Sequence, residues 1–284
     1  PPYKTFCARF EKPIVQDEDA NAVRRLNQFT GPFILRRMKS EVLRELPPKT
    51  ENVRRVELET EQRKLYLAAV VDAREKLRAA KPEDKMTVFA VLMRLREICC
   101  DPRLVADNWT GSSAKLEACL ELVTEAVAGG HRILLFSQFT SMLELLAKRL
   151  DEAGVSHFTL QGSTPKPVRA EQVRRFNQGE ADVFLISLRA GGTGLNLTAA
   201  DIVIHYDPWW NLAAQNQATD RAYRIGQRNP VQVYRLIAQD TIEEKIVELQ
   251  QAKQSLADTV TGGADGAILS MNPEQLLQLL GEEA

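Results

Sequence analysis

The stretch NQATDRAYRIGQRNP, residues 216–230, contains three arginines and no other basic residue. Two of them, Arg221 and Arg224, are three positions apart, so a helix would place them on one face. The residues before them favour a helix, and Gly226 and a later proline predict where it ends. Arginine stays charged and makes forked hydrogen bonds to phosphate, so this pair suits a phosphate-bearing ligand. Salt bridges from the pair to Asp220 or to glutamates are the structural alternative.

The second half of the chain alternates short apolar segments with amphipathic helices. This alternation predicts a parallel sheet covered by helices on both faces, which is an α/β fold. Right-handed crossovers would bring the carboxyl ends of the strands to one edge, where open α/β sheets bind ligands. The predicted strands are residues 132–136, 156–160, 182–187, 201–206 and 231–238. Before residue 110 the patterns predict helices, with a linker at residues 46–50.

Small and polar residues follow four of the predicted strands, at the edge where ligands are expected. Hydroxyl groups and free backbone amides at strand ends can approach phosphate groups closely. Each segment alone is a weak signal, but four at one edge favour a phosphate-bearing partner. The segments are SQFT at 137–140, QGST at 161–164, LRAGGTGLN at 188–196 and DPWWN at 207–211.

The glycine-rich segment after the third predicted strand invites a dinucleotide-binding interpretation, with Asp207 as an early candidate for the ribose acid. Gly192 and Gly194 match the first two glycines of the GxGxxG fingerprint, but Leu197 stands where the third is needed. A purely structural glycine turn is the other alternative. The chain contains no GxxxxGK[ST] phosphate loop, and its only acidic cluster, at residues 16–19, fits a solvated loop. We therefore predict no metal site, and no nucleotide hydrolysis by this chain alone.

The amino-acid composition narrows the remaining classes of function. Lys and Arg number 37 against 38 Asp and Glu, so bulk charge does not indicate a strongly basic nucleic-acid binder, although amides and hydroxyls can contact phosphate. The four cysteines form no CxxC pair, which predicts buried reduced thiols and no zinc site. His205 lies in an apolar run and is predicted to be a core or strand-end residue. No apolar run approaches the about 20 residues of a membrane span, no signal peptide is visible, and the opening PPYKTF indicates an excised fragment.

Four segments taken together resemble the successive motifs of the second motor lobe of Swi/Snf-type ATPases, the DNA translocases of helicase superfamily two. They are LLFSQFTSMLELLAKRL, LQGSTPKPVRAEQVRRFN, FLISLRAGGTGLNLTAADIVIHYDPWWN and QNQATDRAYRIGQ. The upstream segment GPFILRRMKSEVLRELPPK is similar to that family's stretch between the lobes. The resemblance covers residues 1–260 and implies a RecA-like parallel sheet with helices on both faces, plus an N-terminal all-helical region. It implies inter-lobe protrusions at residues 1–110, the second lobe at 111–260 and a tail with a short helix at 261–284.

The resemblance also implies a role for individual residues. Arg221 and Arg224 match the arginine fingers that stabilise charge on the γ-phosphate of ATP. Gln215, Gly194 and Asn196 would line the nucleotide cleft. Residues expected to touch DNA are Ser137, Gln138, Gly162, Ser163, Thr164, Arg189, Gly192, Thr193 and Trp210, the last of them facing the minor groove. Tyr223 stands where the family often has histidine, Leu212 where it often has proline and Arg189 where it often has lysine; the first two put the fine positioning of the fingers in doubt.

The activity implied by the resemblance is ATP hydrolysis that drives movement along double-stranded DNA. ATP with Mg²⁺ would be held mainly by the first lobe, so the chain alone is expected to be inactive. The expected partners are double-stranded DNA and the N-terminal motor lobe of the same protein, in a monomer without membrane contact. The expected location is the cytoplasm, at the bacterial nucleoid, or the nucleus in a eukaryote. The alternatives are a DNA- or protein-binding module without ATPase function and a dinucleotide-dependent enzyme.

Overall fold

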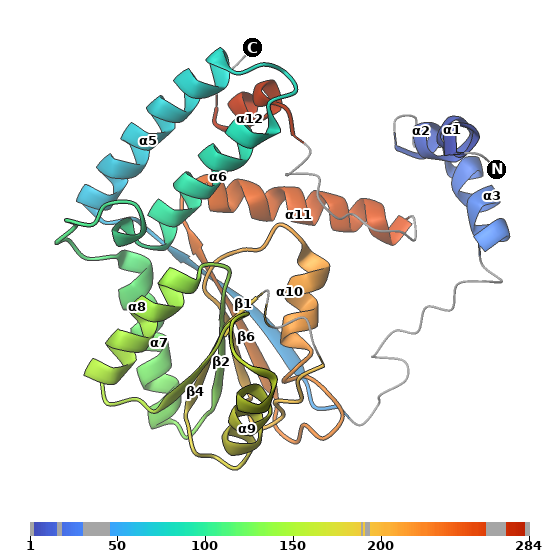
Figure 1. Ribbon diagram of the computed structural model, residues 1–284. Coiled ribbons are helices and arrows are strands. Elements are labelled where there is room, and N and C mark those ends of the chain that lie inside the picture. Colours follow the sequence, from blue (N-terminus) through green and yellow to red (C-terminus); the bar gives the residue numbers. More distant parts are fainter. Residues whose placement is uncertain are drawn as a thin grey trace. The chain divides into compact units, whose positions relative to one another are not determined.

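The computed structural model describes residues 3–15, 19–30, 46–188, 190, 194–259 and 271–281 of the chain (Figure 1). The chain divides into two compact units. Residues 1–45 with 251–264 form one unit, and residues 46–250 with 265–284 form the other. The sheet and all the candidate site residues belong to the second unit.

In the described part of the chain, six strands form one sheet in which every pair is parallel. The spatial order is β1-β6-β5-β2-β4-β3. The strands are β1 (Lys49–Val56), β2 (Ile133–Ser137), β3 (His157–Leu160), β4 (Val183–Ser187), β5 (Ile202–His205) and β6 (Val231–Ala238). All five strands predicted from the sequence are confirmed. Strands β2, β4 and β5 are buried along their whole length, which is why they appear in the sequence as continuous apolar runs.

Strand β1 was not predicted and lies within the region expected to be helical. Its sequence KTENVRRV is polar, and its side chains are mostly exposed. A strand at the edge of a sheet pairs on one side only and tolerates charged residues, so hydrophobic periodicity gives no signal for it. Lys49 pairs with Val231 in register, and ion pairs of Glu51 with Arg235 and of Arg54 with Glu121 hold the strand. The α/β fold with helices before the second strand is otherwise as expected.

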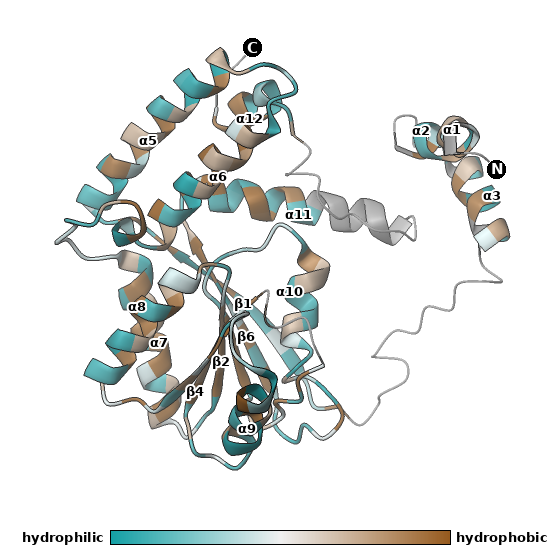
Figure 2. Cartoon of the chain, in the orientation of Figure 1, coloured by the Kyte–Doolittle hydropathy of each residue, from teal (hydrophilic) through white to brown (hydrophobic). Residues whose placement is uncertain are grey.

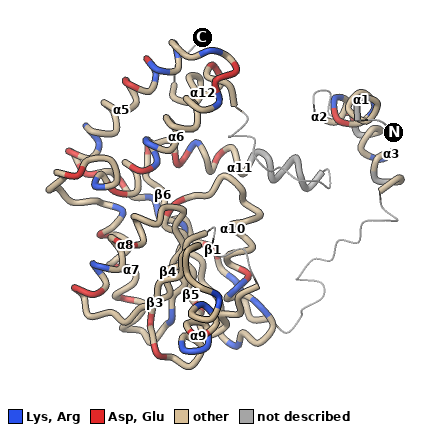
Figure 3. The backbone as a smooth tube through the Cα atoms, viewed as in Figure 1, with Lys and Arg blue, Asp and Glu red and all other residues tan. Residues whose placement is uncertain are grey.

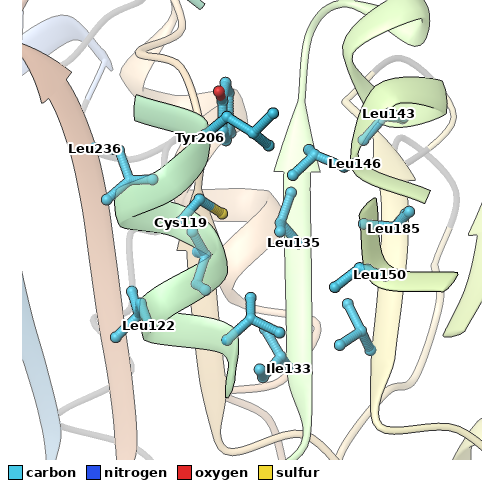
Figure 4. Close-up of a cluster of buried hydrophobic side chains, with 14 of the residues drawn as sticks. Cys119, Leu122, Ile133, Leu135, Leu143, Leu146, Leu150, Leu185, Tyr206 and Leu236 are labelled. Carbon is cyan, nitrogen blue, oxygen red and sulfur yellow. The ribbon is translucent and has the colours of Figure 1, made fainter. Parts of the chain in front are cut away.

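Helices cover both faces of the sheet. Helices α7 (Ala114–Ala128) and α8 (Thr140–Glu152) pack on one face, and α9 (Lys166–Asn177) and α10 (Leu212–Thr219) pack on the other. In the first core, Cys119 of α7 lies toward β2 and Leu122 lies toward β6, while Leu135 of β2 meets Leu146 of α8 (Figure 4). Successive residues of β2 alternate between the two cores, so both faces of this strand are apolar (Figure 2).

A third apolar cluster joins α5, α6 and the start of α11. The helices are α5 (Thr60–Ala79), α6 (Lys85–Cys100), α11 (Ile242–Thr259) and α12 (Pro273–Leu279), with a 3₁₀ turn at Pro102–Leu104. Leu276 of α12 is fully buried against this cluster. Helices α5 and α6 belong to the same compact unit as the sheet, so the division into two units does not mark the expected domain boundary at residue 110. That boundary remains a prediction.

The other unit contains α1 (Tyr3–Phe6), a π-helical segment (Cys7–Glu11), α2 (Lys12–Val15) and α3 (Ala20–Thr30). Acidic and basic residues are interspersed along α5 and α11, in keeping with the net charge of −1 (Figure 3). Among the described residues, no helix is both long enough and apolar enough to cross a membrane.

Candidate functional site

The carboxyl ends of the central strands meet at one edge, as the sequence predicts. Ser137 at the end of β2 is in register with Ser187 at the end of β4, and Phe136 is in register with His205 of β5. Leu160 at the end of β3 pairs with a residue near the end of β4. The four polar segments therefore leave the sheet side by side, and α10 follows one of them.

The expectation that Arg221 and Arg224 share a helical face is wrong. Helix α10 ends at Thr219, and both arginines lie in a series of tight turns that follow it. Within these turns the backbone N–H of Arg221 donates to the carbonyl of Ala218, and that of Arg224 donates to Ala222. These hydrogen bonds span three and two residues, so the backbone is wound more tightly than an α-helix. The relative direction of the two side chains is set by the turns and not by helical periodicity.

Gln227 holds the turn that follows α10, and the sequence patterns suggested no role for it. Its side-chain Nε2 donates to the carbonyls of Thr198, Ala200 and Ala222, at 3.3, 2.7 and 3.2 Å. It thereby fastens the arginine turn to the residues after the glycine-rich segment. The only sign of this contact in the sequence is that Gln227 directly follows Gly226 at the end of the segment QNQATDRAYRIGQ.

Two further features hold this turn. Leu197 donates its backbone N–H to the carbonyl of Arg221 at 3.1 Å. Gly226 has a φ of +101°, a conformation that favours glycine. Tyr223, which lies between the two arginines in the sequence, is half-buried and packs against the core. Lys49 Nζ lies 5.9 Å from the centre of the Tyr223 ring. The aromatic ring that departs from the family pattern thus contacts the start of β1.

Neither arginine forms a salt bridge with a carboxylate among the described residues. Arg221 is only 5% exposed, its Nε has no hydrogen-bond partner, and Arg224 is exposed. Over the ranges that the structure describes, no Asp or Glu oxygen lies within 4.0 Å of either guanidinium. Burial lowers the pKa of Arg221, the positive charges of Arg224 and Arg169 lower it further, and the negative charge of Asp220 opposes this shift. The salt-bridge alternative is therefore not what the structure contains.

The residues predicted to line the nucleotide cleft have different surroundings. Gly194 and Asn196 are exposed, and Gly194 has a φ of +32°. The backbone carbonyl of Asn196 accepts a hydrogen bond from Asn177 Nδ2 at 2.8 Å. Gln215 is only 2% exposed, and its Oε1 accepts the backbone N–H of Trp209 at 3.2 Å. Gln215 thus holds the loop before α10 and offers little surface to a ligand.

Among the residues predicted to touch DNA, those after β3 are accessible. Gly162 and Ser163 are exposed and Thr164 is half-buried. The Thr164 Oγ1 accepts the backbone N–H of Gln161 at 3.0 Å, which closes the turn and leaves the N–H and hydroxyl groups of its tip toward solvent. Arg189, Gly192 and Thr193 lie outside the described residues.

Three other residues predicted to touch DNA make contacts that hold the sheet edge together in this structure. Ser137 is fully buried and donates its hydroxyl to Asp207 Oδ1 at 2.6 Å, so it offers no group to DNA in this structure. The Gln138 Oε1 accepts from Arg96 Nη1 at 2.8 Å. Trp210 is half-buried, with its ring centre 4.1 Å from the Arg96 guanidinium. From the sequence, Asp207 was considered only as a ribose ligand, and Arg96 carried no signal at all.

His205 and three of the four cysteines are buried as predicted, whereas Cys7 is only partly buried. The His205 ring is buried and stacks on Phe136, with 5.5 Å between ring centres, and its Nε2 lies 2.9 Å from Thr219 Oγ1. Burial, with the positive charge of Arg235, lowers the pKa of His205 to about 3, so the ring is neutral. Burial raises the pKa of Cys119 to about 12, and Cys99 and Cys100 are buried likewise. In the described part of the chain, no group of three or more His, Cys, Asp or Glu side chains is arranged to hold a metal ion.

Comparisons with known proteins agree with this geometry. The family model described as helicase conserved C-terminal domain matches residues 114–226, and the SNF2-related domain model matches residues 2–104. An uncharacterized ATP-dependent helicase of Mycoplasma pneumoniae is 38% identical over 277 residues, which are 97% of this chain and 26% of the relative. The SWI/SNF-related matrix-associated actin-dependent regulator of chromatin subfamily A member 1 of Mus musculus is 37% identical over 255 residues, which are 85% of this chain and 24% of the relative. The chain thus spans about a quarter of the length of these relatives.

Solved structures give the same assignment. The SWI2/SNF2 ATPase core of Sulfolobus solfataricus in complex with double-stranded DNA aligns with a TM-score of 0.70 at 30% identity, over 99% of this chain and 61% of that one. The C-terminal domain of the same ATPase aligns with a TM-score of 0.68 at 27% identity, over 83% of this chain and all of that one. The two adjoining family models, the RecA-like parallel sheet and these relatives show that the chain belongs to the SNF2 family of ATPases, a family of DNA-binding translocases, and carries its helicase C-terminal lobe after the end of its SNF2-related domain.

Proposed function

We propose that this chain is the C-terminal lobe of an ATP-dependent translocase of double-stranded DNA. Arg221 and Arg224 act on ATP that the N-terminal motor lobe of the same protein holds, and the strand-end loops contact the DNA backbone. A relative described as an ATP-dependent helicase and a homologous ATPase core solved with double-stranded DNA support this proposal. The functional division is that expected from the sequence, with inter-lobe protrusions at residues 1–110, the lobe at 111–260 and a tail at 261–284.

The observation that carries the proposal is that two neighbouring like charges, Arg221 and Arg224, form no salt bridge among the described residues. Arg221 is almost fully buried with an unbonded Nε, and Arg224 lies close enough to lower its pKa. A buried cation that makes no salt bridge costs several kcal/mol, and the charge of Asp220 offsets only part of the effect of burial and of the neighbouring arginines, so a bound anion would stabilise the site. A phosphate group supplies both negative charge and acceptor oxygens that match the fork of a guanidinium.

The described residues fit the phosphates of ATP better than they fit its magnesium ion. The arginine turn supplies cationic donors, whereas no carboxylate cluster suited to a metal ion occurs among the described residues. The sequence also contains no GxxxxGK[ST] loop. We therefore assign Mg²⁺ and most phosphate contacts to the N-terminal lobe. Arg221 and Arg224 orient the γ-phosphate and stabilise its charge during transfer, a role worth about 10³ to 10⁵ in rate for arginine fingers.

DNA contact is assigned to the exposed turn at residues 161–164, to the segment at 189–193 and to the half-buried Gln138 and Trp210. Backbone amides and hydroxyl groups bind phosphate oxygens in any sequence, so binding should be sequence-tolerant and weakened by salt. Ser137 is omitted from this surface because its hydroxyl is buried on Asp207. A protein that acts on chromosomal DNA works where the chromosome lies, which in a bacterial cell is in the cytoplasm.

The proposal is tested by ATP turnover of the full-length protein with and without duplex DNA. We expect Arg224→Ala to lower the DNA-stimulated rate at least about 10³-fold, because a transition-state contact is lost. Arg228→Ala is the matched control, since Arg228 is also an exposed arginine of this segment but lies beyond Gly226. Unchanged turnover in Arg224→Ala would contradict the finger assignment. DNA binding by a wild-type protein without any ATP turnover would favour the alternative, a binding module without ATPase function.

A further inference from the structure

One buried guanidinium joins α6 to two of the polar loops at the sheet edge. Arg96 is fully buried, and its Nη1 donates to Gln138 Oε1 at 2.8 Å. Its Nη2 donates to the carbonyl of Pro208 at 2.5 Å and to Asp207 Oδ2 at 3.3 Å. Three acceptors on two loops that are about 70 residues apart in sequence therefore share one planar group from a helix outside the sheet.

Aromatic rings cover the faces of the same guanidinium. The ring centre of Trp210 lies 4.1 Å from Arg96 Cζ, and that of Phe139 lies 5.4 Å from it. Each ring belongs to one of the two loops that supply the acceptors. Both terminal nitrogens of Arg96 are bonded and two rings lie beside its guanidinium, although Nε has no partner, so neither loop can move without losing a contact to this side chain.

Asp207 extends the network across the strand ends. Its Oδ1 accepts the hydroxyl of Ser137 at 2.6 Å and the backbone N–H of Gln138 at 3.1 Å. Asp207 is itself fully buried. The end of β5 and the start of the loop after β2 are therefore locked together by one carboxylate, which Arg96 neutralises.

From this loop the network reaches the helix before the arginine turn. The backbone N–H of Trp209 donates to Gln215 Oε1 at 3.2 Å, and the carbonyl of Trp209 accepts from Gln250 Nε2. Gln215 lies on α10, which leads directly into Arg221. A continuous set of contacts thus links a loop at the proposed DNA surface to the residues proposed to act on ATP.

We propose that Arg96 and Asp207 are positioning residues that couple DNA contact at the sheet edge to the placement of the arginine turn. This inference rests on the proposed function. A buried ion pair adds little net stability compared with apolar residues of similar volume, so stability alone gives no reason for a charge here. The fixed fork of arginine instead imposes one geometry on all its acceptors, which an apolar side chain cannot do.

The test compares Arg96→Met and Arg96→Lys in the full-length protein, with ATP turnover measured with and without a saturating DNA duplex. Lys115→Met is the matched control because Lys115 and Glu243 form a second ion pair that is also fully buried and touches neither loop. We expect Arg96→Met to lower the ratio of stimulated to unstimulated turnover at least about 10-fold. Arg96→Lys, which keeps the charge without the fork, should lower it by a smaller factor. Lys115→Met should lower stability and keep the wild-type ratio.

A wild-type ratio in both Arg96 variants would overturn the inference. An equal loss of the ratio in Lys115→Met would also overturn it, because general destabilisation would then explain the effect. Circular dichroism identifies variants that do not fold; if Arg96→Met is one of them, Arg96→Lys and Asp207→Asn decide by the same ratio. A wild-type protein that shows no DNA-stimulated turnover would contradict the proposed function itself, which separates that failure from failure of this inference.

Discussion

The buried pair of Lys115 and Glu243 gives the sharpest prediction about stability. Both side chains are fully buried, and Lys115 Nζ lies 2.6 and 2.5 Å from the two carboxylate oxygens. The backbone N–H of Ala238 also donates to Glu243 Oε2 at 2.8 Å. Replacing Lys115 by Met would leave the carboxylate buried with that single N–H from the backbone of β6. Removing one partner of such a pair costs about 3–5 kcal/mol of unfolding free energy.

The double variant Lys115→Met/Glu243→Gln isolates the charge effect. The side-chain amide that Glu243→Gln introduces can still accept the Ala238 N–H through its oxygen but carries no charge, so the uncompensated carboxylate is gone. We expect the double variant to recover most of the stability lost in Lys115→Met. Urea unfolding of the 284-residue chain measures this. With a slope of about 2 kcal/mol per M, a loss of about 4 kcal/mol moves the midpoint by about 2 M.

The Lys115→Met variant should also depend on pH in a defined direction. Burial raises the pKa of Glu243, and the positive charge of Lys115 opposes that rise. Without Lys115 the folded-state pKa rises further above the value in the unfolded chain. A raised folded pKa gives stability that is present at low pH and is lost as pH rises through that value. The deficit of Lys115→Met should therefore be largest at neutral pH and shrink near about pH 5. Equal losses in the single and double variants, at every pH, would refute this account.

Three other outcomes are expected. His205 has a pKa of about 3 in the folded chain, against about 6.5 in the unfolded chain. The unfolded chain therefore binds more protons below about pH 6.5, so the free energy of unfolding falls as pH falls. By about pH 5 the loss should be about 2 kcal/mol, and His205→Gln should remove this pH dependence in urea titrations. Gly226→Ala meets no neighbour closer than 4.0 Å but would hold alanine at a φ of +101°, so unfolding experiments should show a loss of about 1–2 kcal/mol from backbone strain alone. In fluorescence anisotropy, duplexes of unrelated sequence should bind the chain with similar affinity that falls steeply as salt rises, whereas a strong preference for one sequence would argue against contact through the DNA backbone.

Sequence alone determined the features that depend on neighbouring residues along the chain. The five strands from β2 to β6 were predictable because buried parallel strands are continuous apolar runs between amphipathic helices. Their common carboxyl edge follows from the handedness of the crossovers. The roles of Arg221 and Arg224 were suggested by a motif of local spacing, and the buried position of His205 followed from the apolar residues around it.

Only the tertiary structure decided the features that depend on distant contacts. Strand β1 is polar and exists because it pairs with β6, which lies about 180 residues further along the chain. The turns after α10 are held by Leu197 and Gln227, which donate to the carbonyls of Arg221 and Ala222 from distant parts of the chain or of the turn. Ser137 is buried because Asp207 requires a donor, and Asp207 is neutralised by Arg96, which lies 111 positions earlier. Local periodicity carries no information about such pairs, because a buried charge is satisfied by whatever the fold brings beside it.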